Sequence, residues 1–147
     1  MKRIAILAVL LLITPASGQT VTDGDRFQLG EERVRLWGID APEPDQICER
    51  DGRPVAVGSA AAATLDALLQ DLDGCQPLGT DRHGWTVARC YTLGGDDIGQ
   101  MLVLAGVAWD YPKFSDGDYA DEEEEARENG RGNWSMDCIA PWEWRRQ

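Results

Sequence analysis

Hydrophobic and polar residues alternate in parts of this chain in the way that is typical of short β-strands. Phe27 and Leu29 alternate with polar neighbours, and residues 33–39 alternate again after a turn. Residues 75–78 and 86–91 flank a glycine-containing turn, which predicts a hairpin. We therefore expect four or five strands.

Three segments are predicted to be helices. Residues 58–69 contain an alanine run followed by leucines at helical spacing. Asp97 is placed to cap a second helix over residues 98–104, which Gly106 would end. The charged segment 119–129 forms the third.

Strands interleaved with helices, without the regular β-α-β alternation of a parallel sheet, predict an α+β fold on a small barrel. The sequence shows no internal repeat and no linker that would divide it. We therefore expect residues 19–147 to form one domain, a length that suits a single core.

The first 18 residues have the organisation of a secretory signal peptide. Lys2 and Arg3 precede an apolar run of ten residues, and Ala16 and Gly18 are small residues before a cleavage point. A membrane-spanning helix needs about 20 apolar residues, roughly twice as many. We expect a secreted or periplasmic monomer without stable membrane association.

Export changes the interpretation of the four cysteines, Cys48, Cys75, Cys90 and Cys138. Without a C-x-x-C pair they support a zinc site only weakly, and an even number in an oxidising compartment favours two disulfides. Three pairings are possible. We favour Cys75–Cys90, which would face each other across the hairpin, with Cys48–Cys138 as the second pair.

The net charge argues against tight binding of nucleic acid. The chain has 14 basic and 26 acidic residues, a net charge of −12, and without Lys2 and Arg3 the charge becomes −14. Nucleic-acid-binding domains usually carry a basic surface, because neutralisation of phosphates supplies much of their affinity. We expect weak binding of single-stranded DNA or RNA.

A short stretch of the chain nevertheless contains the side chains that phosphodiester hydrolysis needs: Asp25, Arg35, Asp40 and Glu43. Carboxylate oxygens are the ligands that Ca²⁺ prefers, and a bound Ca²⁺ polarises a phosphodiester. A glutamate can accept a proton from attacking water, and an arginine can hold two phosphate oxygens. The set predicts metal-assisted hydrolysis.

Each of these signals is weak when taken alone. Asp-Gly-Asp is a common turn sequence, and its second copy at 116–118 is interpreted only as a turn. Strict alternation also places Arg35 and Asp40 on opposite faces of a strand. Their convergence requires a bend, for which Gly38 is the candidate.

Several motifs occur along the chain in a fixed order: Val21-Thr22-Asp23-Gly24-Asp25, Val34-Arg35-Leu36-Trp37-Gly38-Ile39-Asp40-Ala41-Pro42-Glu43, Asp81-Arg82-His83-Gly84, Tyr119, Ala126-Arg127 and Gly132-Asn133-Trp134. With these motifs in this order, the chain resembles the thermonuclease (staphylococcal nuclease-like) family over essentially all of residues 19–147. The block at 34–43 is the most specific part of the resemblance.

The resemblance implies a five-stranded OB-fold β-barrel with three helices and Ca²⁺-dependent phosphodiesterase activity. It implies that Asp25 and Asp40 bind Ca²⁺ through their side chains and Ala41 through its backbone carbonyl. Glu43 is implied to act as the general base or to position water. Arg35 is implied to stabilise the developing negative charge.

Three positions depart from the pattern of the family. Arg26 stands where the family usually has a threonine beside the metal, so Arg26 would fill or shield that corner. His83 replaces the usual tyrosine and keeps a flat ring for base stacking. Trp85 stands in the place of a second catalytic arginine, and the loss of one such donor costs about 10²–10³ in rate.

Arg82 and Arg89 are the candidates to replace the missing arginine. Arg89 lies four residues beyond Trp85 on the same strand face, about 13 Å away, whereas Arg82 lies in the turn. An ordinary solvated residue or a contact to a substrate phosphate is the simpler interpretation of Arg82. We therefore assign Arg82, His83 and Trp85 to substrate binding.

The C-terminal residues Trp142, Trp144, Arg145 and Arg146 allow two interpretations. Aromatic and basic residues together are typical of a membrane-interface segment. We favour a tail that packs back on the barrel and is held there by Cys138.

Two functional hypotheses result. The first is an exported Ca²⁺-dependent nuclease that hydrolyses DNA or RNA and is weakened by Trp85. The second is a non-catalytic OB-fold module that binds nucleic acid, an oligonucleotide or a protein partner. The retained carboxylates and Arg35 favour the nuclease, whereas Trp85, Arg26 and the acidic charge favour the binding module.

Overall fold

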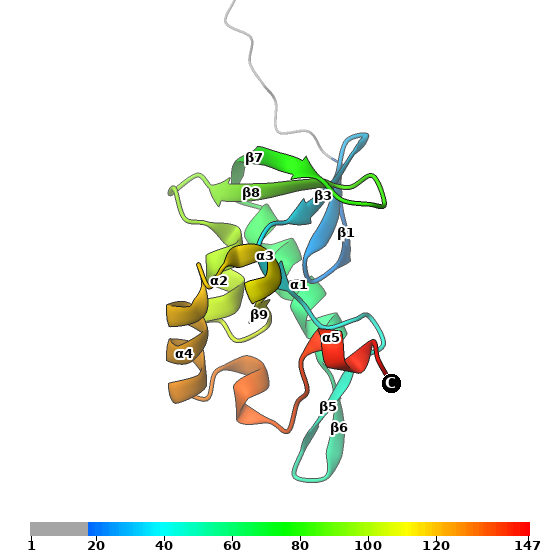
Figure 1. Cartoon of the computed structure of the whole chain (residues 1–147), viewed down its shortest axis with the longest axis vertical. Helices are drawn as coiled ribbons and strands as arrows, with labels where there is room; N and C mark the ends of the chain where they lie inside the picture. The colour runs from blue at the N-terminus through cyan, green and yellow to red at the C-terminus, as the bar shows by residue number, and fades with distance from the viewer. Residues whose placement is uncertain (1–17) are drawn as a thin grey trace, which may run out of the picture.

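The computed structural model describes residues 18–147 and shows a mixed α+β fold (Figure 1). The predicted signal peptide, residues 1–18, lies outside the described residues except for Gly18. The main sheet has five strands in the order β1-β2-β3-β8-β7. Their bounds are β1 (Gln19–Asp23), β2 (Arg26–Leu29), β3 (Glu32–Leu36), β7 (Leu72–Thr80) and β8 (Thr86–Thr92).

Short strand pairs and helices complete the described part of the chain. Strand β4 (Ile39–Asp40) pairs with β9 (Trp109–Asp110), and β5 (Ile47–Arg50) pairs with β6 (Arg53–Ala56). The helices are α1 (Val57–Leu69), α2 (Ile98–Leu104), α3 (Pro112–Ser115), α4 (Ala120–Glu128) and α5 (Pro141–Trp144), and a 3₁₀ turn covers Gly132–Ser135.

The prediction of a five-stranded barrel with three helices is only partly correct. The five strands are present, but the sheet is open, because its two edge strands, β1 and β7, do not pair with each other. Helices α1, α2 and α4 are the three predicted ones. Helices α3 and α5 are additional single turns that begin at Pro112 and Pro141, and four residues are too few to show a helical period.

One parallel strand pair brings the two halves of the sequence together. Strands β3 and β8 run parallel, with Arg35 opposite Val87. The neighbouring pair β7 and β8 is the predicted hairpin, and it is antiparallel with Cys75 opposite Cys90. Arg35 therefore lies beside the turn that joins β7 to β8.

Helix α1 forms because every fourth residue of its sequence is apolar. Val57, Ala61, Leu65 and Leu69 are all buried, and this face packs against β1. Together with the inner residues of the sheet and α2, they form the core, whose largest members are Phe27, Leu36, Ile39, Leu65, Leu69, Ile98 and Leu102.

The second and third predicted helices also have the expected ends. The Asp97 side chain caps α2 by accepting a hydrogen bond from the backbone N–H of Gln100 at 3.2 Å. Gly106 follows α2 with a φ of 74° and its N–H donates to the carbonyl of Val103. Helix α4 has acidic residues in its first turn, where they favour the positive end of the helix dipole.

The C-terminal segment is attached to the β5–β6 hairpin, and α5 lies beside this hairpin (Figure 1). A disulfide joins Cys48 of β5 to Cys138, and a second disulfide joins Cys75 to Cys90, which is the pairing that the sequence favoured. The backbones of Glu49 and Asp137 exchange two hydrogen bonds of 2.9 and 3.0 Å. The tail therefore packs back on the fold.

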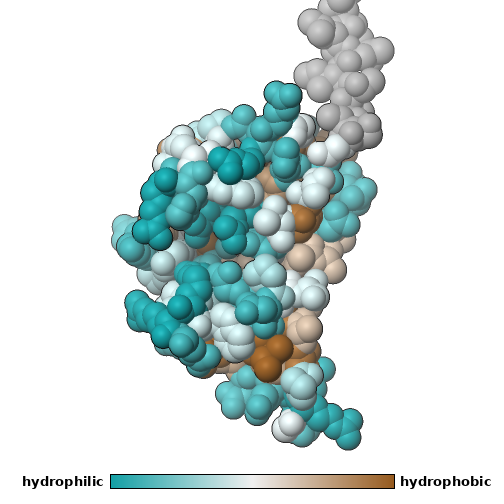
Figure 2. Space-filling view, turned by 90° about the vertical axis from the view of Figure 1, so that its right-hand side faces the viewer, coloured by the Kyte–Doolittle hydropathy of each residue, from teal (hydrophilic) through white to brown (hydrophobic). Residues whose placement is uncertain are grey.

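Hydrophilic residues cover most of the face shown in Figure 2, and the hydrophobic ones on it form small separate spots. Within residues 18–147, no helix is long and apolar enough to cross a membrane.

Candidate active site

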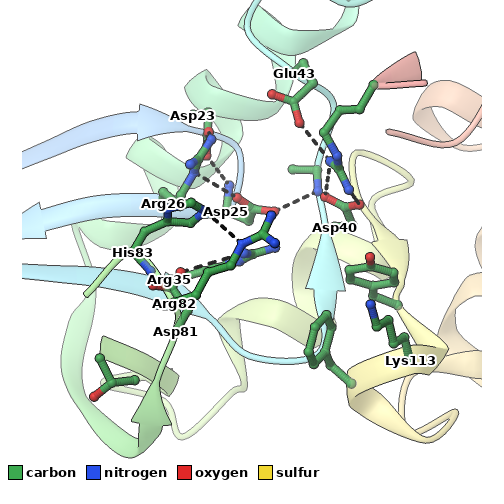
Figure 3. Close-up of a pocket in the computed structure, with 15 residues that line it drawn as sticks. Asp23, Asp25, Arg26, Arg35, Asp40, Glu43, Asp81, Arg82, His83 and Lys113 are labelled. Atoms are coloured by element: carbon green, nitrogen blue, oxygen red, sulfur yellow. Dashed lines mark hydrogen bonds and ion pairs between the residues drawn. The ribbon is translucent and has the colours of Figure 1, made fainter. Parts of the chain in front are cut away.

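A cavity of about 660 Å³ brings together side chains that are far apart in the sequence (Figure 3). Its five acidic residues are Asp23, Asp25, Asp40, Glu43 and Asp81. Its five lysines and arginines are Arg26, Arg35, Arg82, Lys113 and Arg145. The formal charges of these side chains cancel within the cavity, although the whole chain carries −12. The acidic protein thus concentrates cations at one place.

A turn brings Arg35 and Asp40 into the same cavity. Strand β3 ends at Leu36, and Gly38, with a φ of 77°, turns the chain into β4. A side chain at Gly38 would be strained at this positive φ, and its Cβ would lie 3.1 Å from the ring of Tyr119. The bend proposed at Gly38 is present, so both side chains line one cavity.

Asp25 and Asp40 are buried carboxylates at the floor of the cavity, 5% and 2% exposed. Asp25 Oδ2 accepts a hydrogen bond of 2.9 Å from the backbone N–H of Ala41. Burial, and then the negative charge of Asp23 and of Asp40, raise the pKa of Asp25 well above its ordinary value. Burial also raises the pKa of Asp40, although Arg145 opposes the shift.

Burial makes the charged form of these two carboxylates costly, and neighbouring acidic side chains add to this cost. A hard cation would offset this cost, and carboxylate and carbonyl oxygens are its preferred ligands. Asp25, Asp40 and the carbonyl of Ala41 therefore have the chemistry to hold Ca²⁺. Within residues 18–147, no group of three or more His, Cys, Asp or Glu side chains is arranged around one metal position.

Glu43 lies on a short loop that Gln46 closes. The Gln46 side-chain oxygen accepts from the backbone N–H of Glu43 at 3.1 Å, and the Gln46 N–H donates to the Glu43 carbonyl at 2.9 Å. The Gln46 side chain is buried and also donates to the carbonyl of Ile139 at 3.0 Å. One side chain thus connects the Glu43 loop to the C-terminal segment, a role that no local pattern around Gln46 indicated.

Gly58 is needed for the position of the Glu43 loop. A Cβ at Gly58 would lie 2.1 Å from the Glu43 carbonyl oxygen and 2.9 Å from that of Pro44. In a solvent-exposed helix, alanine would be favoured over glycine by about 1 kcal/mol. Here we expect Gly58→Ala to destabilise the protein by about 1–3 kcal/mol, because the clash is with backbone. Urea unfolding measures this difference.

Ser59→Ala is the matched control for Gly58→Ala, because Ser59 is the next residue of α1 and is exposed. We expect a change within about 0.5 kcal/mol for this variant. Equal stability of Gly58→Ala and the wild-type protein would contradict the proposed close contact with the Glu43 loop.

Arg26 neutralises the acidic corner beside Asp25. Its Nε donates to Asp23 Oδ2 at 2.8 Å, its Nη2 also contacts this oxygen, and its Nε lies 3.8 Å from Asp25 Oδ1. Arg26 therefore contacts both acidic side chains on this side of the cavity.

The turn between β7 and β8 carries the residues assigned to substrate binding. Asp81 Oδ1 accepts from the backbone N–H groups of His83 and Trp85, each at 2.9 Å, and this fixes the turn. Arg82 and His83 line the cavity. Trp85 is not among its lining residues, and its ring lies 5.7 and 5.2 Å from the guanidinium groups of Arg26 and Arg33.

Arg89, the other candidate for the missing arginine, lies outside the cavity. Its guanidinium pairs with Asp118 and lies 4.1 Å from the ring centre of Trp37. Arg89 therefore belongs to a separate polar cluster.

The cavity also contains residues that the sequence did not indicate. Tyr111, Lys113 and Phe114 form one wall, and the Tyr111 ring stacks on Trp142 with 5.2 Å between centroids. Arg145 contributes a guanidinium from the C-terminal end, 102 positions beyond its partner Glu43. No local spacing could reveal such a contact.

Comparison with known proteins identifies the family of this chain. The family described as staphylococcal nuclease homologue matches residues 33–136. The chain belongs to this family.

Three curated relatives illustrate the similarity. The chain is 36% identical over 140 residues to the succinoglycan biosynthesis protein ExoI of Rhizobium meliloti (strain 1021), covering 88% of this chain and 73% of the relative. It is 31% identical over 131 residues to an uncharacterized endonuclease of Escherichia coli O157:H7, with 85% and 80% covered. It is 26% identical over 125 residues to the probable staphylococcal-like nuclease CAN1 of Oryza sativa subsp. japonica, with 84% and 35% covered.

Proposed function

We propose that this protein is an exported, Ca²⁺-dependent nuclease that hydrolyses phosphodiester bonds of single-stranded DNA or RNA. The observation that supports this most is the cavity itself. It combines three buried aspartates, a glutamate that is 22% exposed and five basic side chains in an otherwise acidic protein. This combination suits the binding of an anionic substrate together with a metal cation.

The side chains have separate roles in this proposal. Arg35 holds the phosphate with its planar fork and stabilises the charge that develops there. Glu43, which lines the cavity, accepts a proton from the attacking water. Asp25, Asp40 and the carbonyl of Ala41 hold Ca²⁺, which supplies positive charge to the phosphodiester when it is bound.

Arg82 and His83 are placed to contact the chain of the substrate. Both lie in the β7–β8 turn at the edge of the cavity, and Arg82 Nε is 3.1 Å from His83 Nε2. The exposed ring of Phe114 and the ring of Tyr111 offer flat surfaces to bases on the opposite wall. We propose a monomer that binds nucleic acid weakly because of its overall charge.

A secreted or periplasmic location is part of the proposal. Two disulfides support it, because such bonds persist in oxidising compartments.

A non-catalytic binding module is the second candidate, and a specific observation favours it. Arg26 and Arg145 already pair with Asp23 and with Asp40, so the carboxylates of the site have internal partners. Trp85 also leaves the β7–β8 turn without the second arginine of the family.

Cleavage of single-stranded DNA with and without Ca²⁺ tests the proposed function. We expect the purified protein to cut with Ca²⁺ and to stop when EGTA is added. Glu43→Gln should lower the rate by about 10²–10⁴, because it removes the proton acceptor. Electrophoresis of a labelled oligonucleotide measures the products.

Glu49→Gln is the control for Glu43→Gln, because Glu49 is exposed on β5 and does not line the cavity. Its rate should equal that of the wild-type protein. If the wild-type protein is inert and the Trp85→Arg variant cuts DNA, the protein is a nuclease that has lost its activity. If the protein neither cuts nor binds the oligonucleotide, both candidates are wrong.

A further inference from the structure

A guanidinium from the last residues of the chain contacts the two carboxylates at the centre of the candidate site. Arg145 Nη1 donates to Asp40 Oδ1 at 3.1 Å and Nη2 to Asp40 Oδ2 at 2.7 Å. Arg145 Nη1 also donates to Glu43 Oε1 at 2.8 Å. Arg145 lines the same cavity as Arg35 and is 38% exposed.

Several independent contacts fix the segment that carries Arg145. The Cys48–Cys138 disulfide and the Gln46 bond to Ile139 hold the chain before α5. Pro141, at the start of α5, is buried, and the ring of Trp142 is stacked on Tyr111. A side chain on a segment fixed in this way belongs to the site and is not a loose end of the chain.

The geometry of the contact is the one that arginine uses for phosphate. Two parallel N–H donors meet the two oxygens of Asp40, which is the fork arrangement that guanidinium groups form with carboxylates and with phosphates. An ion pair that only compensates the charge of the buried Asp40 is the simpler alternative. Such a pair would affect stability, but its loss would not weaken the binding of a phosphate.

We propose that Arg145 is a second phosphate-binding catalytic residue of this site, supplied by the C-terminal segment in a chain whose β7–β8 turn has Trp85. This inference rests on the proposed nuclease function. Asp40 and Glu43 hold the guanidinium beside the position of the scissile phosphate. When substrate binds, Arg145 donates to the phosphate oxygens and stabilises the negative charge that develops on them.

The same contact makes Arg145 a competitor of a cation at Asp40. Both Asp40 oxygens accept from Arg145, so a cation would have to compete with this guanidinium for Asp40. Loss of the Arg145 charge should therefore strengthen Ca²⁺ binding and, at the same time, weaken substrate binding.

The test compares Arg145→Ala with Arg146→Ala in the full chain. Arg146 is the next residue, is exposed and does not line the cavity, so it controls for loss of one positive charge from the same segment. We expect Arg145→Ala to lower kcat/KM for single-stranded DNA by about 10²–10³, and Arg146→Ala to leave it unchanged. Arg145→Lys, which keeps the charge but loses the fork, should fall between them.

Two binding measurements accompany the rates. Fluorescence anisotropy of a labelled, phosphorothioate-linked oligonucleotide in Ca²⁺ should show weaker binding by Arg145→Ala than by Arg146→Ala. Calorimetric titration with Ca²⁺ alone should show tighter binding by Arg145→Ala. Thermal unfolding of each variant confirms that α5 and the rest of the fold are retained.

The outcomes separate this inference from the proposed function. If the wild-type protein does not cut, the proposed nuclease function is wrong, and the oligonucleotide affinity alone decides the role of Arg145. If Arg145→Ala cuts DNA as fast as or faster than Arg146→Ala, Arg145 only forms a structural ion pair or blocks the site. The inference is then overturned. If the wild-type protein is inert and Arg145→Ala binds the oligonucleotide as tightly as Arg146→Ala does, the inference is also overturned.

Discussion

We expect Arg35→Ala to lower the rate of Ca²⁺-dependent DNA cleavage by about 10³–10⁵, the range for an arginine that stabilises a phosphoryl-transfer transition state. Arg35 lines the cavity, and the ion pair that it forms with Asp81 is long, at 3.8 Å. Its guanidinium is therefore free to bind phosphate. Single-turnover rates with a labelled oligonucleotide measure the effect.

The stability of Arg35→Ala should change by less than about 1 kcal/mol, because the ion pair that it removes is long and partly exposed. Arg53→Ala is the control, since Arg53 is exposed on the β5–β6 hairpin and lies outside the cavity. An Arg35→Ala protein that is fully folded and cuts at the wild-type rate would rule out a role for Arg35 in catalysis.

Removal of the Cys48–Cys138 disulfide should have the largest effect on stability. The bond closes a loop with a sequence separation of 90, and a crosslink of about this size constrains the unfolded chain by roughly 4–5 kcal/mol in the chain-entropy model. We expect Cys48→Ala/Cys138→Ala to lose about 2–5 kcal/mol of the free energy of unfolding. Urea unfolding measures this loss.

The second disulfide provides the control. Cys75→Ala/Cys90→Ala opens a loop with a sequence separation of only 15 across an existing strand pair, far from the tail. Both variants should be compared at a temperature at which they remain folded. We expect cleavage to fall further when Cys48–Cys138 is removed, because the segment that holds Arg145 is then loosened. Equal rates would show that the tether does not position Arg145.

The charge distribution explains how an acidic protein can act on an acidic polymer. Long-range repulsion from a net charge of −12 slows the approach of nucleic acid, but salt screens it beyond about 8–10 Å. Inside the cavity, the basic side chains balance the acidic ones. We therefore expect a phosphate to meet no net repulsion inside the cavity, although the surface around it is weakly repelling.

The sequence by itself determined the parts of this protein that depend on neighbouring residues. The alternation around Phe27, the four-residue spacing in α1 and the capping side chain of Asp97 have local physical causes, so they could be predicted. The motif from Arg35 to Glu43 likewise identified the family, because its residues lie close together in the chain.

The tertiary structure decided what depends on distant segments. The sheet stays open, because strand closure is set by pairing between edges and not by the pattern within a strand. Trp85 lies outside the cavity, and its ring contacts the guanidinium groups of Arg26 and Arg33. These contacts join residues of different segments, so they could not be predicted from the sequence around Trp85.

Arg145 is the clearest case of a residue that the sequence alone could not place. It reaches Asp40 from 105 positions away, because a disulfide, one buried glutamine and one aromatic stack fold the tail back. Contacts at such separations follow no period along the chain. The sequence therefore indicated Arg26, Arg35 and Arg82, which all line the cavity, and only the fold brought Arg145 to its carboxylates.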